Sequence, residues 1–323
     1  MQTVQLRGSR QSVATAVTGT GGWHLGQEGR QRLVYLAFIA PAAAFVLIFF
    51  AYPLAMDIVM SLENYGFLAI LHGHGIFTGL ANYSSALSSS VTHRAIINTA
   101  IFTAASIICQ FVIGFAMAVY FNRRFWGAET LRRLILIPWV MPLVAAGTMF
   151  QLVFTTPTGL ADEALRTLGI AHNVAWFSSG ALSLLVIIIA NIWAGVPFNA
   201  ILLYSGLQDV PGELLEAASV DGAGPWRRFL SVTVPTMRGV ILIVLMLGVV
   251  YTVKAFDLVI ILTDGGPANE SQLLSSWAYT QAFTNFDFGH GAAVGNVLLI
   301  FCLCVGLIYL RMSRDTSGTG GLR

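Results

Sequence analysis

The sequence predicts an all-α membrane protein whose core is a bundle of six transmembrane helices. Hydrophobic residues make up 56% of its 323 residues, charged residues only 10%, and the mean hydropathy is +0.75. Soluble domains carry about 25% charged residues. Six apolar runs are long enough for a helix to cross about 30 Å of hydrocarbon. These runs lack the period-two alternation of membrane β-barrel strands, so a helical bundle is favoured.

We place the six spans, in chain order, at 33–62, 95–121, 134–154, 181–207, 239–263 and 292–310. Pro41 and Pro53 predict bends in the first span, because proline removes a backbone donor. That run is too long for the hydrophobic region of a signal peptide, so we expect it to remain as an anchor. The three cysteines fall within spans, where a thiol behaves as a small hydrophobe, and we expect no disulfide.

The positive charges predict how the chain is oriented. Of the 17 Lys and Arg residues, 14 lie before the first span, between the second and third, between the fourth and fifth, or after the sixth. Cationic loops stay on the cytoplasmic side, so both termini are predicted to be cytoplasmic. We expect a disordered cytoplasmic tail over 1–32, a six-helix domain over 33–312 with a cytoplasmic loop at about 208–236, and a cytoplasmic tail over 313–323.

Signatures of catalysis and of nucleotide binding are missing from the sequence. It contains neither His-Glu-x-x-His nor Gly-x-Ser-x-Gly, and His72 and His74 are too isolated to form a metal site. A phosphate-binding loop needs a lysine after glycine, whereas the single lysine, Lys254, follows Val253. We therefore expect no enzyme activity, metal, cofactor or nucleic-acid partner for this chain, and any ATP and Mg²⁺ to be bound by another chain.

A polar insert between the fourth and fifth spans predicts a helix, a break and a second short helix. Asp209, Pro211 and Glu213 are typical of a helix start. The segment Asp-Gly-Ala-Gly-Pro over 221–225 cannot continue a helix, because glycine loosens the backbone and proline lacks a donor. The second helix has aromatic residues beside two arginines. It is either a docking element for a soluble partner or an amphipathic helix lying on the inner leaflet.

This insert resembles the coupling loop of ABC importer permeases. The family pattern is Glu-Ala-Ala, three residues, Gly, nine residues, a hydrophobe, one residue and Leu-Pro. The chain matches it at Glu216, Ala217, Ala218, Gly222, Val232 and Pro235, and has Val234 where leucine is usual. Segments 77–83, 191–198, 206–211 and 256–267 are similar to those of the carbohydrate-uptake branch, the maltose, trehalose and glycerol-3-phosphate type.

The resemblance implies a type I ABC importer permease in a bacterial plasma membrane, in contact with membrane lipid. It also implies three protein partners: a cytoplasmic ABC ATPase dimer, an external solute-binding protein and a second homologous permease. The segment Gly-Gly-Pro over 265–267 resembles the first subunit of such pairs, so we expect a heterodimer. The residues expected to couple to the ATPase are Glu216, Ala217, Ala218, Asp221, Gly222, Trp226, Arg227, Phe229 and Pro235.

Polar and aromatic residues within the spans are candidates for contact with the solute, because polar groups in lipid are costly unless they face a cavity or a partner. By resemblance to maltose-type permeases, the expected solute-binding residues are Asn191, Gly195, Phe198, Tyr251 and Thr252, with Ala194, Gly248 and Ala255 beside them. Lys254 and Asp257 join this set as the charged residues of the fifth span. This set suits a sugar, a related polyol or a glycerol phosphate ester. An interhelical hydrogen bond is the alternative role for Asn191.

Lys254 and Asp257 allow a further interpretation. Their spacing of three residues would place them on one helix face, where they could form a structural ion pair. If unpaired, the lysine would favour an anionic solute. The alternative function for the chain is an ATP-independent secondary transporter that couples to an ion gradient through these two residues.

Overall fold

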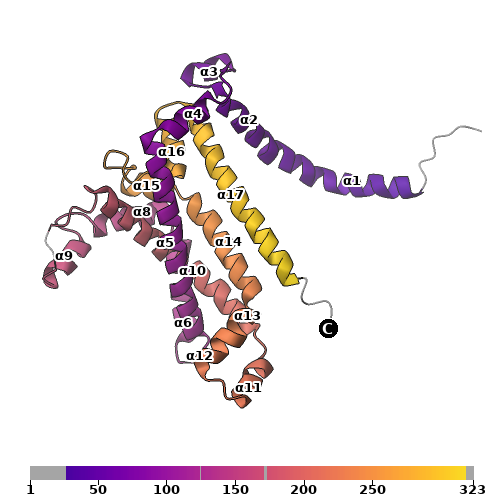
Figure 1. Ribbon diagram of the computed structural model, residues 1–323, viewed down its shortest axis with the longest axis vertical. Helices are drawn as coiled ribbons and strands as arrows, with labels where there is room; N and C mark the ends of the chain where they lie inside the picture. The colour runs from indigo at the N-terminus through magenta and orange to yellow at the C-terminus, as the bar shows by residue number, and fades with distance from the viewer. Residues whose placement is uncertain (1–26, 124, 171–172, 318–323) are drawn as a thin grey trace, which may run out of the picture. The chain divides into compact units, whose positions relative to one another are not determined.

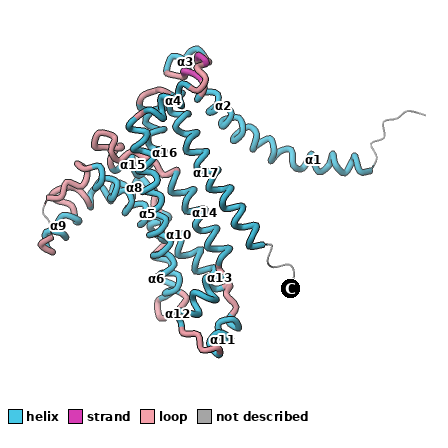
Figure 2. Tube along the Cα trace, viewed as in Figure 1, coloured by secondary structure: helices cyan, strands magenta, loops and turns pink. Residues whose placement is uncertain are grey.

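The computed structural model describes residues 27–123, 125–170 and 173–317, and is almost entirely helical (Figures 1 and 2). In chain order the elements are α1 Gln27–Val46, the π-helix η1 Leu47–Ala51, α2 Tyr52–Ser61, β1 Glu63–Asn64, α3 Phe67–His72, β2 Ile76–Phe77, α4 Ala81–Ser88, α5 Ser90–Phe121, α6 Ala128–Leu134, α7 Ile137–Val140, α8 Leu143–Val153, α9 Leu160–Thr167, α10 Gly180–Gln208, α11 Gly212–Val220, α12 Pro225–Arg228, η2 Phe229–Thr233, α13 Val234–Thr236, α14 Arg238–Val253, α15 Asp257–Leu262, α16 Leu274–Tyr279, η3 Thr280–Thr284 and α17 Phe288–Ser317. The two short strands pair antiparallel.

The chain divides into two units, residues 1–54 and 55–323. In the first unit, α1 begins at Gln27, inside the segment predicted as a tail, and the rest of that segment lies outside the described residues. The π-helix η1 ends at Ala51, two residues before Pro53. A proline ring clashes with the carbonyl four residues before it, and a wider π turn accommodates that clash.

Four described helices have the length and hydropathy of a membrane span, and two bent pairs raise the total to six if each pair is one span. The four correspond to the first, second, fourth and sixth predicted spans. The last of them, α17, continues to Ser317, so the predicted tail over 313–323 begins as helix and its end lies outside the described residues. A multi-span helical protein is therefore confirmed.

The third and fifth spans differ from the continuous helices expected at 134–154 and 239–263. Helices α6 to α7 meet α8 at 93°, because Pro142 holds Met141 in an extended conformation with ψ 134°. The fifth span is preceded by a 72° bend between α13 and α14, and it is broken inside, where α14 ends at Val253 before α15 starts at Asp257. The Ser275 hydroxyl donates to the carbonyl of Ala255 in that second break, at 3.3 Å.

Helices α5 and α10 lie side by side and form the centre of the second unit (Figure 1). Their close approach depends on glycine. A Cβ added to Gly114 would lie 2.7 Å from Cβ of Asn199, and one added to Gly195 would lie 2.4 Å from Cδ of Gln110. Small residues at such crossings are typical of membrane helix packing, where dispersion and hydrogen bonds replace the hydrophobic effect.

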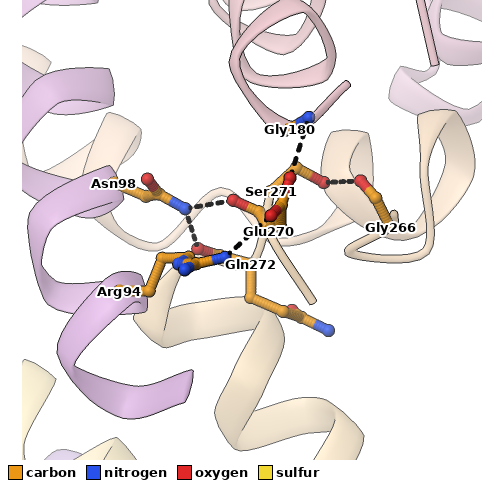
Figure 3. A network of polar contacts seen from close by, with 7 residues as sticks. All are labelled: Arg94, Asn98, Gly180, Gly266, Glu270, Ser271 and Gln272. Atoms are coloured by element: carbon orange, nitrogen blue, oxygen red, sulfur yellow. Dashed lines mark hydrogen bonds and ion pairs between the residues drawn. The ribbon is translucent and has the colours of Figure 1, made fainter. Parts of the chain in front are cut away.

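A clasp, defined here as the loop 264–272, ties α5 to the start of α10 (Figure 3). The Asn98 amide on α5 donates to the carbonyls of Glu270 and Gln272 at 2.8 and 3.0 Å. The Glu270 carboxylate accepts from Gly180 N at 3.2 Å and pairs with Arg94 at 3.0 Å. The clasp thus joins the two central helices at the end opposite the coupling loop.

Replacing Asn98 with leucine should lower the free energy of unfolding by about 2–4 kcal/mol, because two carbonyls lose their donors at a buried position. Thermal unfolding of the purified protein in detergent measures this. Arg94→Gln is the matched control, since its ion pair is half exposed and should contribute less than about 1 kcal/mol. An equal loss of unfolding free energy in both variants would mean that the Asn98 amide is not the main contact that stabilises the clasp.

Candidate functional site

A cavity of about 600 Å³ brings together the residues predicted to bind the solute. Its walls come from α5, α7, α10 and α14, with the start of α8 and of α15. The lining residues are Gln110, Trp139, Leu143, Asn191, Ala194, Gly195, Phe198, Asn199, Gly248, Tyr251, Thr252, Lys254, Ala255, Phe256, Asp257 and Leu258. All seven predicted solute-binding residues are among them, although they come from three elements and the break between two of these.

Helical spacing explains why α10 presents its part of this wall. Asn191, Ala194, Gly195 and Phe198 recur at intervals of three or four residues, so they share one face of the helix. Gly195 leaves room for the Gln110 side chain, whose amide donates to the carbonyl of Asn191 at 2.9 Å. The wall is therefore held in place by a contact between α5 and α10.

The cavity combines aromatic faces with side-chain amides. The Phe198 ring lies 5.7 Å from that of Trp139 and 5.9 Å from that of Tyr251. The buried Nδ2 of Asn191 has no hydrogen-bond partner, whereas Asn199 donates to the carbonyl of Gly195 at 3.0 Å. A buried donor without a partner costs free energy, so a solute that accepts from Asn191 would be favoured.

Of the two roles left open for Lys254 and Asp257, the structural ion pair is not formed in the structure. The helix ends between the two residues, so the spacing of three no longer places them on one face. Lys254 Nζ instead lies 4.7 Å from the ring centroid of Tyr251, within range for a cation–π interaction. Both charged side chains line the cavity separately.

Because the two charges are unpaired, we expect the effects of Lys254→Met and Asp257→Asn on stability to be additive within about 0.5 kcal/mol. A double-mutant cycle of unfolding free energies in detergent measures the coupling. A coupling energy well above that value would show that the two side chains attract each other directly.

Sequence reasoning missed six residues of the cavity wall, namely Gln110, Trp139, Leu143, Asn199, Phe256 and Leu258. Gln110 is buried in the middle of an apolar span, and that polar position was the available signal. Trp139 lies just before the 93° turn between α7 and α8, for which Pro142 was the available signal, but its place in the cavity wall depends on the packing of α7 against α10. Asn199 follows Phe198 directly and lies between α5 and α10.

The coupling loop has the predicted helix, break and second helix. Pro211 caps α11, Glu213 lies in its first turn, and Pro225 occupies the first turn of α12. Between the helices, Gly222 adopts φ +76°, a left-handed conformation that favours glycine. The break thus follows directly from the local sequence.

The loop exposes most of the residues predicted to couple to an ATPase. Helix α11 has no buried residue, and Glu216, Ala217, Asp221, Gly222, Arg227 and Pro235 are exposed, with Ala218 half-buried. Trp226 is 70% exposed and stacks on Phe229 at 5.7 Å. Phe229 itself packs against Phe115 of α5 at 5.2 Å, so it anchors the loop while Trp226 remains available to a partner.

No group of three or more potential metal ligands occurs in the part of the chain that the structure describes. The polar groups at the two regions are side-chain amides, hydroxyls and isolated charges. Such groups bind and orient a solute or a partner by hydrogen bonds and stacking.

Comparison with known proteins places this arrangement in a family. Residues 110–318 match the model of the binding-protein-dependent transport system inner membrane component. The chain is 32% identical, over 91% of its own length and 91% of the relative's, to the diacetylchitobiose uptake system permease protein DasB of Streptomyces coelicolor. It is 30% identical to the arabinooligosaccharides transport system permease protein AraP of Bacillus subtilis, over 93% and 94% of the two chains.

The fold agrees with this assignment. A chain from the crystal structure of a bacterial alginate ABC transporter, in complex with an alginate pentasaccharide-bound periplasmic protein, superposes with a TM-score of 0.76 at 20% identity. That likeness covers 90% of this chain and 98% of the other. The protein belongs to the inner-membrane permease family of binding-protein-dependent ABC importers, and it is a multi-pass membrane protein.

Proposed function

We propose that this chain is the permease subunit of an ATP-driven importer that takes up a saccharide or a related polyhydroxyl solute through the cavity between α5, α10 and α14. The main support is that one helix, α10, connects the cavity to the coupling loop. Helix α10 supplies four predicted cavity positions and then ends at Gln208, directly before the coupling loop. A movement of the loop therefore reaches the cavity wall through one continuous helix.

The chemistry of the cavity supports a saccharide. Sugar rings stack on aromatic faces, which Trp139, Phe198 and Tyr251 provide, and their hydroxyls exchange hydrogen bonds with amides such as Gln110 and Asn191. A volume of about 600 Å³ lies within the usual range of roughly 300–1,000 Å³ for small-molecule sites. The names of similar permeases point the same way, to diacetylchitobiose, trehalose or maltose, and arabinooligosaccharides.

The partners follow from the same proposal. A cytoplasmic ABC ATPase dimer would bind ATP and Mg²⁺ and receive the exposed α11–α12 region. An external binding protein would deliver the solute, and a second homologous permease would complete the pathway as a heterodimer. Both termini would be cytoplasmic. The arginines of the coupling loop and those between α5 and α6 would then lie on the cytoplasmic side, where cationic loops are retained.

The secondary-transporter alternative has less support. It assigns ion coupling to Lys254 and Asp257, and both residues line the cavity proposed for the solute. The family match also concerns transport systems that depend on a binding protein.

Cross-linking tests the docking part of the proposal. A cysteine placed at Val220, which is 88% exposed at the end of α11, should cross-link to the co-expressed ATPase in membranes. A cysteine at Leu160, 72% exposed on the opposite side of the predicted membrane, serves as the control. Cross-linking from neither position, in membranes where the assembled complex is purified from the same cells, would contradict docking through the loop.

A further inference from the structure

A polar network connects the segment between the second and third predicted spans, residues 122–134, to the end of α10. The Tyr204 hydroxyl accepts a hydrogen bond from Nη1 of Arg132 and another from Nε2 of Gln208, the latter at 2.6 Å. The guanidinium carbon of Arg132 also lies 4.9 Å from the Tyr204 ring centroid. One arginine is thus held by both the hydroxyl and the ring face of a single tyrosine.

Arg132 is fixed in its own helix as well. Its Nε donates to the carbonyl of Ala128 at 3.3 Å, so the guanidinium contacts α6 and α10 together. Arg132 and Tyr204 are both half-buried, and both line a groove of about 1,060 Å³ at this end of the molecule. Charge-assisted hydrogen bonds that are partly shielded from water are stronger than exposed ones.

The neighbouring arginine shows what is particular to this position. Arg133 pairs with Glu129, four residues away in the same helix, and its side chain is 76% exposed. That pair holds α6 to itself and joins no second element. Of these adjacent arginines, Arg132 alone links the loop to α10.

The network lies between the coupling loop and the cavity. Gln208 is the last residue of α10, and α11 begins four residues later. On the other side, α6 continues toward α7, whose Trp139 lines the cavity and faces Phe198. A second route from loop to cavity therefore runs through Arg132 and Trp139, beside the direct route along α10.

We propose that Arg132, Tyr204 and Gln208 are positioning residues that lock α6 to the root of the coupling loop, so that movement of the loop is transmitted to the Trp139 side of the cavity. This inference rests on the proposed function. Without the network, α10 would still move with the ATPase, but α6 and α7 would lag behind. Nucleotide hydrolysis would then continue with less solute moved for each ATP.

The test compares variants in proteoliposomes that contain the permeases, the ATPase and the binding protein, and measures solute imported per ATP hydrolysed. Arg132→Gln should lower this ratio at least about fivefold, the low end of typical coupling between sites. Arg133→Gln, the matched control, should leave it unchanged. Tyr204→Phe keeps the ring and loses the hydroxyl, so its ratio should fall between those of the wild type and Arg132→Gln.

A second readout separates positioning from simple loss of stability. Spin labels at Glu129 on α6 and Glu213 on α11 should show one narrow distance distribution in the wild type and a broader one in Arg132→Gln. Where Arg132→Gln fails to assemble, Tyr204→Phe decides in its place. An unchanged ratio with an unchanged distribution in an assembled variant would overturn the inference.

The outcome is distinguishable from failure of the proposed function. Wild-type uptake that needs no ATP would remove the proposed function whatever Arg132 does. Wild-type uptake that needs ATP, together with a normal ratio in Arg132→Gln, would keep the function and remove this inference alone.

Discussion

Gly222→Val should reduce ATP-driven uptake about 10- to 100-fold while the protein still inserts and assembles. Gly222 adopts φ +76° at the break between α11 and α12, and a β-branched residue in that conformation is strained by about 1–3 kcal/mol. An added Cβ meets nothing within 4 Å, so the effect arises from the backbone and not from a clash. The strain is relieved by re-aiming the two helices, which misplaces the docking surface.

Uptake and ATP hydrolysis measured together in proteoliposomes check this expectation. The matched control is Gly224→Ala in the same turn, because Gly224 has φ −65° and also has open space around an added Cβ. Gly222→Asn should recover part of the activity, since asparagine tolerates the left-handed region better than valine. Normal uptake by Gly222→Val would show that the break does not need its left-handed turn.

Asn191→Leu should raise the solute concentration that half-saturates uptake by roughly 10- to 100-fold. The free energy of unfolding should stay unchanged or rise slightly. The Nδ2 of Asn191 is buried without a partner, so the empty protein gains nothing from it. A solute hydroxyl that accepts from this amide would lose a buried hydrogen bond in the variant. The alternative role, an interhelical hydrogen bond, predicts the opposite pattern of lost stability and normal half-saturation.

Thr103→Val is the control for that experiment. Thr103 Oγ1 is likewise buried without a partner, but it does not line the cavity. Its replacement should therefore leave half-saturation unchanged. The solute dependence of uptake for both variants, measured with the same binding protein, decides between the two roles of Asn191.

The parts of this molecule that follow from the sequence are those with local causes. The break in the coupling loop comes from glycine and proline within five residues, and the structure has the same break. The spans come from apolar runs of sufficient length, and α5, α10 and α17 cover the predicted second, fourth and sixth spans. The turn before Pro142 also had a local signal, since a residue before proline avoids helical backbone.

Other features depend on contacts between distant segments. The sequence around Lys254 gives no signal that α14 ends at Val253. An ion pair between Lys254 and Asp257 on one helix face would need a helix that continues through both residues. Trp139 joins the cavity wall because α7 packs against α10. The sequence around Tyr204 gives no signal of a partner, because its contact with Arg132 depends on how α6 packs against α10.

The most direct test of the account is uptake into proteoliposomes that contain this chain, its co-purified permease and ATPase partners, and the binding protein. Labelled disaccharides and glycerol phosphate esters are supplied with and without ATP. The account predicts accumulation of a saccharide that requires both ATP and the binding protein. Accumulation without ATP that follows an ion gradient would contradict it.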